Sequence, residues 1–480
     1  MELFQSGVGS AAVSRLQALL PLPEDVAAYA GLAHALRGLV VEGHLTVGSR
    51  LPSERTLALA LGLSRTTITR AYSELVATGW ASARQGSGTV VRMPGKTRIP
   101  SLTLVPGPRG SAIDLSAAAG LAPAGTRAVV EKAMQWLPGS LDSAGYEPFG
   151  AQHLRERIAD WFAGRGLPTV ADQVVVTPGA LAGLSAVLHT VLAPGERVLV
   201  ESPTYPHALG AIAGARGRVV SVPLVDGWNA AEWTAAARRS RAAAAYLIPD
   251  FQNPTGLLMT EAERAALAGA LRQAGVVPII DETPAELDLE AEAPRPLPWA
   301  ATDDRAFSIG SLSKVLWGGV RVGWVRCPPG ATDALRARAL QLNLGASALD
   351  QLIATSFLED PQPVLSEVLA RLRSTREAWH GQLAEHLPTW RVNQPRGGLA
   401  LWVELPERRS AELALAADGH GLIVTPGNRF TADRTLANRL RLPLTLPSEV
   451  VPEATRRLAR AWQDALTGRG GVPRPDALAL

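Results

Sequence analysis

The sequence has little of several features that would place it in other classes of protein. Its 480 residues include one cysteine, Cys327, so no disulfide can form within the chain and a cysteine metal cluster is not expected. No apolar run is long and charge-free enough to span a bilayer. The N-terminal stretch has acids at Glu2 and Glu24 and lacks the basic and apolar regions of a secretion signal. We therefore expect a cytoplasmic protein without a membrane segment or a metal site.

Net charge is also small, at +3, but it is unevenly distributed. Between Arg50 and Pro100 there are eight Lys or Arg residues and only two acids. A basic block on an otherwise slightly acidic chain indicates contact with a polyanion, although the charge alone leaves open a merely solvated basic surface. The length, with 47% apolar and 19% charged residues, predicts a globular protein of two or more domains.

Three helices are predicted near the N-terminus. Apolar residues recur at helical spacing over residues 26–41. A second helix follows the cap residue Ser53 and ends near Gly62, and a third runs from the cap residue Ser64 to about Gly79. The third helix has an apolar face that we expect to be buried, made of Ile68, Ala71, Tyr72, Leu75 and Val76.

The opposite face of the third helix is suited to DNA. It presents Arg65, Thr66, Thr69 and Ser73, with Thr67 and Arg70 flanking them. Their guanidinium, hydroxyl and methyl groups, with the amides of the helix N-terminus, can contact base edges and phosphates in a major groove. Predicted strands at 80–84 and 89–92 flank a glycine-rich turn and form a wing. The alternative is a winged helix that contacts only proteins.

This order of elements resembles the winged helix of the GntR family of regulators. The motifs that carry the resemblance are LPSER at 51–55, LSRTT at 63–67 and RQGSGT at 84–89. The resemblance implies DNA contacts from Arg55, Arg65, Thr66, Thr67, Thr69 and Gly88. Some relatives have a basic residue at the position of Thr69, so a base preference there is not implied.

The rest of the chain predicts a second, larger fold. We expect an extension at 1–23, the winged helix at 24–93, a Pro- and Gly-rich linker at 94–112, the second domain at 113–467 and a disordered tail at 468–480. In the second domain, apolar strands at 174–177, 198–201, 244–248, 276–280, 307–309 and 322–325 alternate with helices such as 181–191 and 261–273. This alternation predicts an α/β fold with a mainly parallel sheet flanked by helices.

Polar residues of chemical interest follow these strands, where ligands of such sheets bind. Lys314 has the hydroxyl of Ser311 before it and Arg321 after it. This pattern suits an aldehyde that carries a phosphate, because the amine forms an imine and the other two groups bind the phosphate. Asp281 ends a strand, where a carboxylate can pair with a protonated pyridine nitrogen. Other segments offer an amide, an aromatic ring and a guanidinium, from Asn253, Tyr205 and Arg441.

Together these residues resemble the site of fold-type I, aspartate-aminotransferase-like proteins. With the winged helix, residues 23–466 resemble the MocR subfamily of GntR regulators. The resemblance implies a pyridoxal 5'-phosphate cofactor in a Schiff base with Lys314, with Asp281 at the pyridine nitrogen, Asn253 at the ring hydroxyl and Tyr205 stacked on the ring. It implies phosphate contacts from Ser311, Arg321, Gly179, Ala180 and, across a subunit interface, Tyr146. Arg441 matches the arginine that binds the α-carboxylate of the ligand.

Two positions depart from the family pattern. A tyrosine that often follows the aspartate by two or three residues is absent, because Asp281 is followed by Glu282, Thr283 and Pro284. In the phosphate loop, Pro178 has no N–H and Ala180 has no hydroxyl. We therefore expect little or no aminotransferase activity.

Three functions follow, in order of preference. The first is a homodimeric regulator that binds double-stranded DNA and senses an amino acid or amine through an external aldimine at Lys314. The second is an active aminotransferase with an accessory DNA-binding domain. The third is a DNA-binding regulator whose second domain is a cofactor-free dimerisation scaffold.

Overall fold

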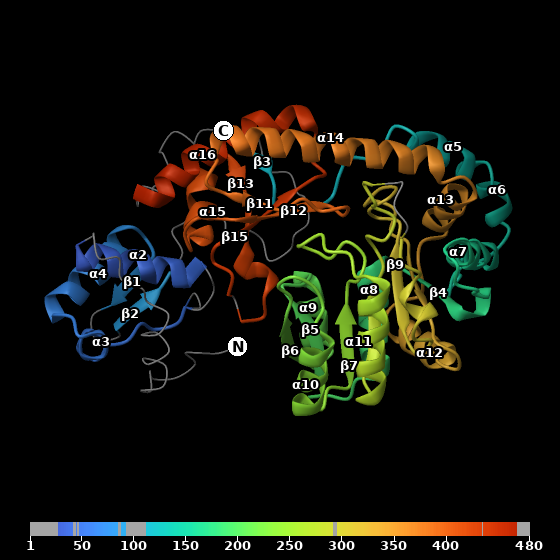
Figure 1. The fold of residues 1–480 in the computed structure, drawn as a ribbon, viewed down its shortest axis with the longest axis horizontal. Helices are drawn as coiled ribbons and strands as arrows, with labels where there is room; N and C mark the ends of the chain where they lie inside the picture. The colour runs from blue at the N-terminus through green and yellow to red at the C-terminus, as the bar shows by residue number, and fades with distance from the viewer. Residues whose placement is uncertain are drawn as a thin grey trace.

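The computed structural model describes residues 27–41, 45, 48–84, 88–92, 112–290, 295–433 and 435–467, without the side chains of His34, Val41 and Arg84. These residues form a winged helix, a large domain around a seven-stranded sheet, and a small domain around a four-stranded sheet (Figure 1). The predicted extension at 1–23, the tail at 468–480 and all of the linker at 94–112 except Ala112 lie outside the described residues.

The winged helix consists of α2 (Ala28–Val41), α3 (Glu54–Leu61), α4 (Arg65–Ala77) and the antiparallel strands β1 (Ala81–Arg84) and β2 (Gly88–Val91). Both predicted caps are confirmed: the hydroxyl oxygens of Ser53 and Ser64 accept the amide hydrogens of Thr56 and Thr67, each at 3.1 Å. Gly62 ends α3 at φ 65°, a conformation that glycine adopts without a Cβ clash.

The apolar face of α4 packs against α2, with Ile68, Ala71, Tyr72 and Leu75 buried as predicted. Tyr72 also donates its hydroxyl hydrogen to the carbonyl oxygen of Pro52 at 2.9 Å, which ties α4 to the segment before α3. The prediction for Val76 was wrong, because its side chain is 37% exposed. Eight residues along a helix of 3.6 residues per turn bring Val76 about 80° around the axis from Ile68, at the edge of the buried face.

The large domain holds a seven-stranded sheet in the order β4-β10-β9-β8-β7-β5-β6. Its strands are β4 (Val174–Thr177), β5 (Arg197–Ser202), β6 (Arg218–Pro223), β7 (Ala244–Leu247), β8 (Val277–Asp281), β9 (Phe307–Ser311) and β10 (Gly323–Arg326). β10 pairs antiparallel with both β4 and β9, while the other pairings are parallel. The predicted mainly parallel sheet is therefore confirmed.

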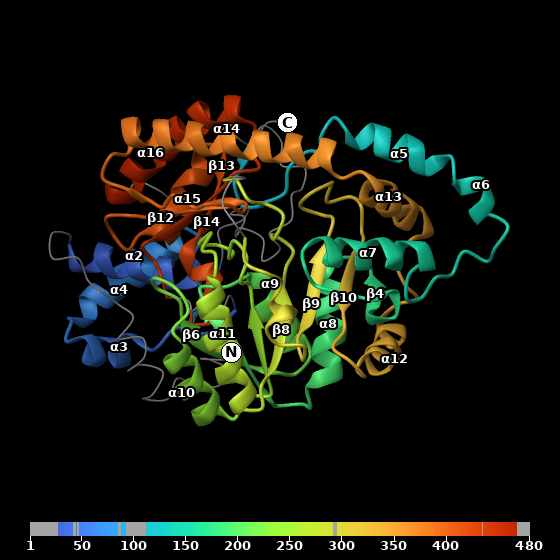
Figure 2. The ribbon, with the colours of Figure 1, turned by 45° about the vertical axis from the view of Figure 1, so that its right-hand side comes forward.

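Helices cover both faces of this sheet (Figure 2). On one face lie α7 (Gln152–Gly164), α10 (Ala230–Ser240) and α11 (Glu261–Gln273). On the other lie α8 (Ala180–Val191), α9 (Pro206–Gly214) and α12 (Thr332–Leu342). Successive strand residues alternate between the two cores, as Val175 and Val176 do on β4, so the sheet is buried on both sides.

The small domain contains the antiparallel sheet β11-β12-β15-β14, made of Arg391–Val392, Ala400–Glu404, Arg439–Pro443 and Thr425–Pro426. β3 (Ile113–Asp114) pairs with β13 (Leu422–Ile423), and α15 (Ser410–Gly419) and α16 (Val451–Thr467) pack beside them. The long helix α14 (Gln362–His386) runs from this domain towards α5 (Thr126–Met134), α6 (Leu137–Ser140) and α13 (Ala348–Glu359) (Figure 1). Single 3₁₀ turns occur at η1 (Ala171–Gln173), η2 (Trp299–Ala301), η3 (Gly427–Phe430) and η4 (Ser448–Val450).

The winged helix packs against the small domain through α2 and α15. Ala411 of α15 is fully buried within the hydrophobic core of the winged helix, and Leu415, one turn further along, packs against the same core. The two domains therefore share apolar contacts as well as a covalent connection.

Two kinds of feature are absent from the residues that the structure describes. Among them, no helix is long and apolar enough to span a membrane, and no group of three or more His, Cys, Asp or Glu residues is arranged to hold a metal ion. Cys327 is buried, and burial raises the pKa of its thiol to about 12, so the thiol stays protonated and unreactive.

Candidate cofactor site and DNA-binding face

The structure brings most of the predicted cofactor residues to one edge of the large sheet. Tyr205 follows β5, Asn253 follows β7, Asp281 ends β8 and Ser311 ends β9. These four strands run parallel, so their carboxyl ends meet at the same edge.

Lys314 lies in the turn after β9, and its Nζ donates a hydrogen bond to the carbonyl oxygen of Ala118 at 2.9 Å. Burial lowers the pKa of its amine to about 8, and the charges of Arg441 and Arg321 act in the same direction. The chain has two other lysines. Lys132 is half-exposed and paired with Glu359 at 2.7 Å, and Lys96 lies outside the described residues. Lys314 is therefore the one enclosed, readily deprotonated amine among the described lysines.

Asp281 is held by two hydrogen bonds. The Tyr246 hydroxyl donates to its Oδ2 at 2.7 Å, and the Thr283 amide donates to its Oδ1 at 2.9 Å. Sequence reasoning missed Tyr246, a fully buried residue on the neighbouring strand β7 that sits in an ordinary apolar run. The Thr283 hydroxyl is buried and has no hydrogen-bond partner among the described residues.

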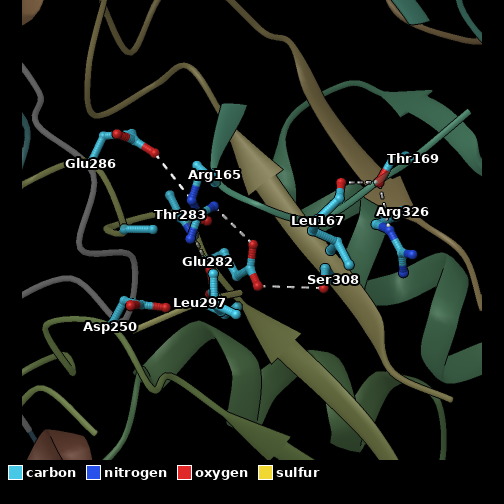
Figure 3. Close-up of polar contacts among 12 residues, drawn as sticks. Arg165, Leu167, Thr169, Asp250, Glu282, Thr283, Glu286, Leu297, Ser308 and Arg326 are labelled. Atoms are coloured by element: carbon cyan, nitrogen blue, oxygen red, sulfur yellow. Dashed lines mark hydrogen bonds and ion pairs between the residues drawn. The ribbon is translucent and has the colours of Figure 1, made fainter. Parts of the chain in front are cut away.

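The acid that follows Asp281 is Glu282, whose side chain points towards Arg165 (Figure 3). The Glu282 side chain is 2% exposed and pairs with Arg165 at 3.1 Å, and Arg165 also lies 3.5 Å from Glu286. Burial raises the pKa of Glu282, while the charge of Arg165 lowers it. Because a strand places successive side chains on opposite faces, Glu282 anchors the core and leaves Asp281 as the carboxylate of the site.

The predicted phosphate contacts gather at the start of α8. Gly179 caps this helix at φ 88°, without a side-chain cap, and a Cβ there would lie 2.4 Å from Nη2 of Arg321. A glycine is therefore needed for the close approach of the guanidinium to the helix N-terminus, where the amide of Ala180 also lies. Arg321 is exposed, with long contacts of 3.4 Å to the carbonyl oxygens of Pro178 and Gly318. Ser311 is buried, and its hydroxyl donates to the carbonyl oxygen of Val322 at 3.1 Å.

The Tyr205 hydroxyl lies 2.7 Å from Nδ1 of His207, and the two rings meet edge to face at 5.1 Å. Burial raises the pKa of Tyr205 to about 12, so the phenol remains neutral. Sequence reasoning missed His207, whose pKa is lowered by burial and by the charges of Lys314 and Arg441. Asn253 is half-buried in the loop after β7. The site thus combines a neutral aromatic pair with an amide.

Arg441 approaches from β15 of the small domain and is 2% exposed. Its Nη2 donates to the carbonyl oxygen of Ser116, and its guanidinium lies 5.1 Å from the Phe430 ring. Burial lowers its pKa to about 10, and its Nε has no hydrogen-bond partner among the described residues. A buried guanidinium with a free N–H can bind a carboxylate.

Beside Lys314, a cavity of about 490 Å³ opens between residues 118–123, α14 and residues 444–449.

Tyr146 does not join the site of its own chain. It is 69% exposed, and the segment between α6 and α7 that carries it lies at an outer edge of the large domain (Figure 2).

The predicted DNA-binding residues lie together on the winged helix. Arg55, Arg65, Thr66 and Gly88 are exposed. The hydroxyl of Thr67 contacts that of the cap residue Ser64 at 2.8 Å. The Thr69 hydroxyl donates within the protein, to Glu54 at 2.8 Å and to the carbonyl oxygen of Arg65 at 3.0 Å, and is therefore partly engaged.

Comparison with known proteins supplies the family. Residues 113–458 match the family described as aminotransferase class I and II, and residues 28–91 match the bacterial regulatory proteins, gntR family. The chain is 30% identical to the uncharacterized HTH-type transcriptional regulator YdcR of Escherichia coli K12, over 91% of this chain and 99% of that protein. The chain belongs to the MocR-type regulators. It is also 27% identical to the HTH-type transcriptional regulator TauR of Rhodobacter capsulatus, over 90% of this chain and 96% of that one.

The second domain of this MocR-type chain has the fold-type I architecture. It resembles the crystal structure of LysN, an α-aminoadipate aminotransferase from Thermus thermophilus, at 29% identity and a TM-score of 0.68, over 74% of this chain and 93% of that one. The protein is a DNA-binding regulator that depends on pyridoxal 5'-phosphate. The unpaired Nε of Arg441 fits a ligand carboxylate. The guanidinium of Arg321, which lies close to Gly179 at the start of α8, fits a phosphate.

Proposed function

We propose that this MocR-type regulator senses an amino acid or another primary amine at the strand-end site and alters its DNA binding in response. The observation that carries the proposal is that Arg441 and Lys314 donate to carbonyl oxygens of the same short segment, those of Ser116 and Ala118. Arg441 is buried with an unpaired Nε, and its charge lowers the pKa of Lys314. A site that joins a reactive amine to an unsatisfied carboxylate partner suits a ligand with both an amino and a carboxylate group.

Each cofactor contact is assigned to a residue at that edge. Lys314 would hold pyridoxal phosphate covalently, and the cofactor would supply the electrophilic carbon with which an incoming amine reacts. Asp281, fixed by Tyr246, pairs with the ring nitrogen, Asn253 binds the ring hydroxyl and Tyr205 stacks on the ring. The phosphate contacts are Ser311, Arg321, Gly179 and Ala180, with Tyr146 of the second subunit.

Coupling to DNA runs through the small domain in this proposal. Arg441 lies on β15, which pairs with β14, and α15 packs on β14. The other side of α15 contributes Ala411 and Leu415 to the winged-helix core. A ligand held by Arg441 shifts the DNA-binding domain if it binds two arrangements of these elements with different affinity.

The proposed assembly is a homodimer. The 69% exposed Tyr146 supplies nothing to its own site, and the exposed apolar side chains of Leu121 and Leu141 lie on neighbouring segments of the chain. Burying such side chains between two subunits is favourable, and two winged helices bind a duplex more tightly than one. For the duplex itself we assign the contacts to Arg55, Arg65, Thr66, Thr67 and Gly88, with Thr69 a minor contributor because its hydroxyl is engaged.

The visible absorbance of the cofactor-loaded protein tests the site. The visible band of the lysine-bound cofactor is expected to be bleached by borohydride in the wild type and in Lys132→Ala, and to be absent in Lys314→Ala. Titration with a panel of amino acids is expected to shift the band for at least one of them. A visible band that is unchanged by every amine would contradict the sensing role. Conversion of the cofactor to its amine form, with repeated turnover of the amino acid, would favour an aminotransferase instead.

A further inference from the structure

A carboxylate outside the predicted cofactor set is buried beside the site without a cation. Glu201 on β5 is 1% exposed, and the described residues give it no ion pair. It accepts hydrogen bonds from Nε1 of Trp228 at 2.9 Å, the amide of Ile248 at 3.0 Å and Nε2 of Gln252 at 3.0 Å. Burial raises its pKa to about 7. An acid is costly to bury in this way, so its position calls for a function beyond packing.

Gln252, one of the two side-chain partners of Glu201, is itself 1% exposed and has all its amide hydrogen-bonding groups in use. Its Nε2 donates to Glu201 and to the carbonyl oxygen of Pro203 at 2.8 Å. Its Oε1 accepts from the amide of Thr255 at 3.1 Å and from the Thr255 hydroxyl at 2.8 Å. Both faces of the amide are used, so Gln252 has a single orientation that satisfies every contact.

These contacts join the two loops that carry Tyr205 and Asn253. Pro203 lies two residues before Tyr205 in the loop after β5, and Gln252 immediately precedes Asn253 in the loop after β7. We propose that Glu201 and Gln252 are positioning residues. Their buried carboxylate–amide contact holds the two loops together, and thereby fixes Tyr205, which stacks on the ring, relative to Asn253, which binds the ring hydroxyl. This inference rests on the assignment of Tyr205 and Asn253 to the cofactor.

Glu201→Gln is the first test variant, because it keeps the shape but places an NH₂ group against one of the three donors. Gln252→Leu removes the link to both loops at similar volume. Glu263→Gln is the matched control, since Glu263 also accepts a hydrogen bond from the Trp228 segment, at 3.2 Å, but does not touch Gln252. For each variant, the cofactor dissociation constant and the circular dichroism of the cofactor band are measured, with the melting temperature of the cofactor-free protein.

The expected result is a dissociation constant raised about tenfold in both test variants, with a weakened dichroic band, and little change in Glu263→Gln. In a background with Tyr205→Ala and Asn253→Ala, Glu201→Gln is expected to add less than twofold, because a positioning residue acts only through the residues it positions. An equal, additive loss in that background would overturn the inference, as would an unchanged dissociation constant and band in both test variants. Absence of the band in the wild type would instead overturn the cofactor assignment itself.

Discussion

Tyr246 donates its hydroxyl hydrogen to Asp281 at 2.7 Å, between the neighbouring parallel strands β7 and β8. Tyr246 is fully buried, so water does not compete for its hydroxyl. The structure thus gives Asp281 a phenol partner from the neighbouring strand of the sheet.

Tyr246→Phe removes this hydrogen bond and leaves the ring in place. A hydrogen bond to a charged group contributes roughly 1.5–3 kcal/mol, so we expect the cofactor dissociation constant to rise about tenfold or more. Tyr205→Phe is the control, because it removes a hydroxyl bonded to His207 but keeps the stacking ring. Equal affinities for Tyr246→Phe and the wild type, measured by titration of the visible band, would show that Asp281 does not need this partner.

Arg441→Gln is expected to abolish the preference for amino acids over amines. Removing one partner of a buried charged pair costs roughly 2–5 kcal/mol, so the affinity for a responding amino acid falls about a hundredfold, while that for the matching amine without a carboxylate changes little. Arg439→Gln, which removes a partly exposed partner of Glu404 on the same strand, is the control. Equal losses of affinity for the amino acid and for the amine would show that the ligand carboxylate does not bind Arg441.

The pKa of Lys314, about 8, predicts the pH dependence of cofactor attachment. The neutral amine is the nucleophile, so the attachment rate to the cofactor-free protein rises with pH up to about 8 and then levels off. With α-N-acetyl-lysine as the reference amine, the rate continues to rise towards its ordinary pKa near 10.4. Parallel curves for protein and reference, followed by stopped-flow absorbance, would show that the site does not lower the pKa of Lys314.

Ala411→Asp tests the coupling between domains. The change places a charge in the winged-helix core, where Ala411 is fully buried, and is expected to detach α15 from α2. The variant is expected still to bind a duplex selected from a random pool. The change in its duplex affinity on addition of the effector is expected to fall below twofold. Asp418→Asn, an exposed change at the other end of α15, serves as the control. A full effector response in Ala411→Asp would rule out this contact as the route.

Arg65→Ala tests the assignment of DNA contacts to α4. Arg65 is exposed at the start of α4, and its loss is expected to weaken binding to a random-sequence duplex and to lower the salt slope of the affinity by about one. Thr69→Ala is expected to have a smaller effect, because the Thr69 hydroxyl already donates to Glu54. An unchanged salt slope in Arg65→Ala would remove that side chain from the phosphate contacts.

Local patterns predicted the elements and the strand-end residues well, and for physical reasons. Ser53 and Ser64 cap helices through contacts three residues away, so a short motif is enough to locate them. The parallel sheet then brings the ends of β7, β8 and β9 together without further information. The error at Val76 arose at a helix edge, where burial depends on what packs nearby.

The contacts that sequence reasoning missed depend on the spatial order of the strands. Tyr246 reaches Asp281 only because β7 lies next to β8, and the two residues are 35 positions apart in the chain. Gln252 reaches Glu201 because β5 lies on the other side of β7. Ala411 meets α2 only through the packing of two domains. None of these pairings leaves a periodic or local signature.

The most direct test of the account is the affinity of the cofactor-loaded protein for a duplex selected from a random pool, measured with and without the amino acid that shifts its visible band. The account predicts a change of about fivefold or more in the wild type and none in Lys314→Ala, since a coupling of roughly 1–3 kcal/mol is typical. The same affinity with and without the amino acid in the wild type, or the same response in Lys314→Ala, would contradict it.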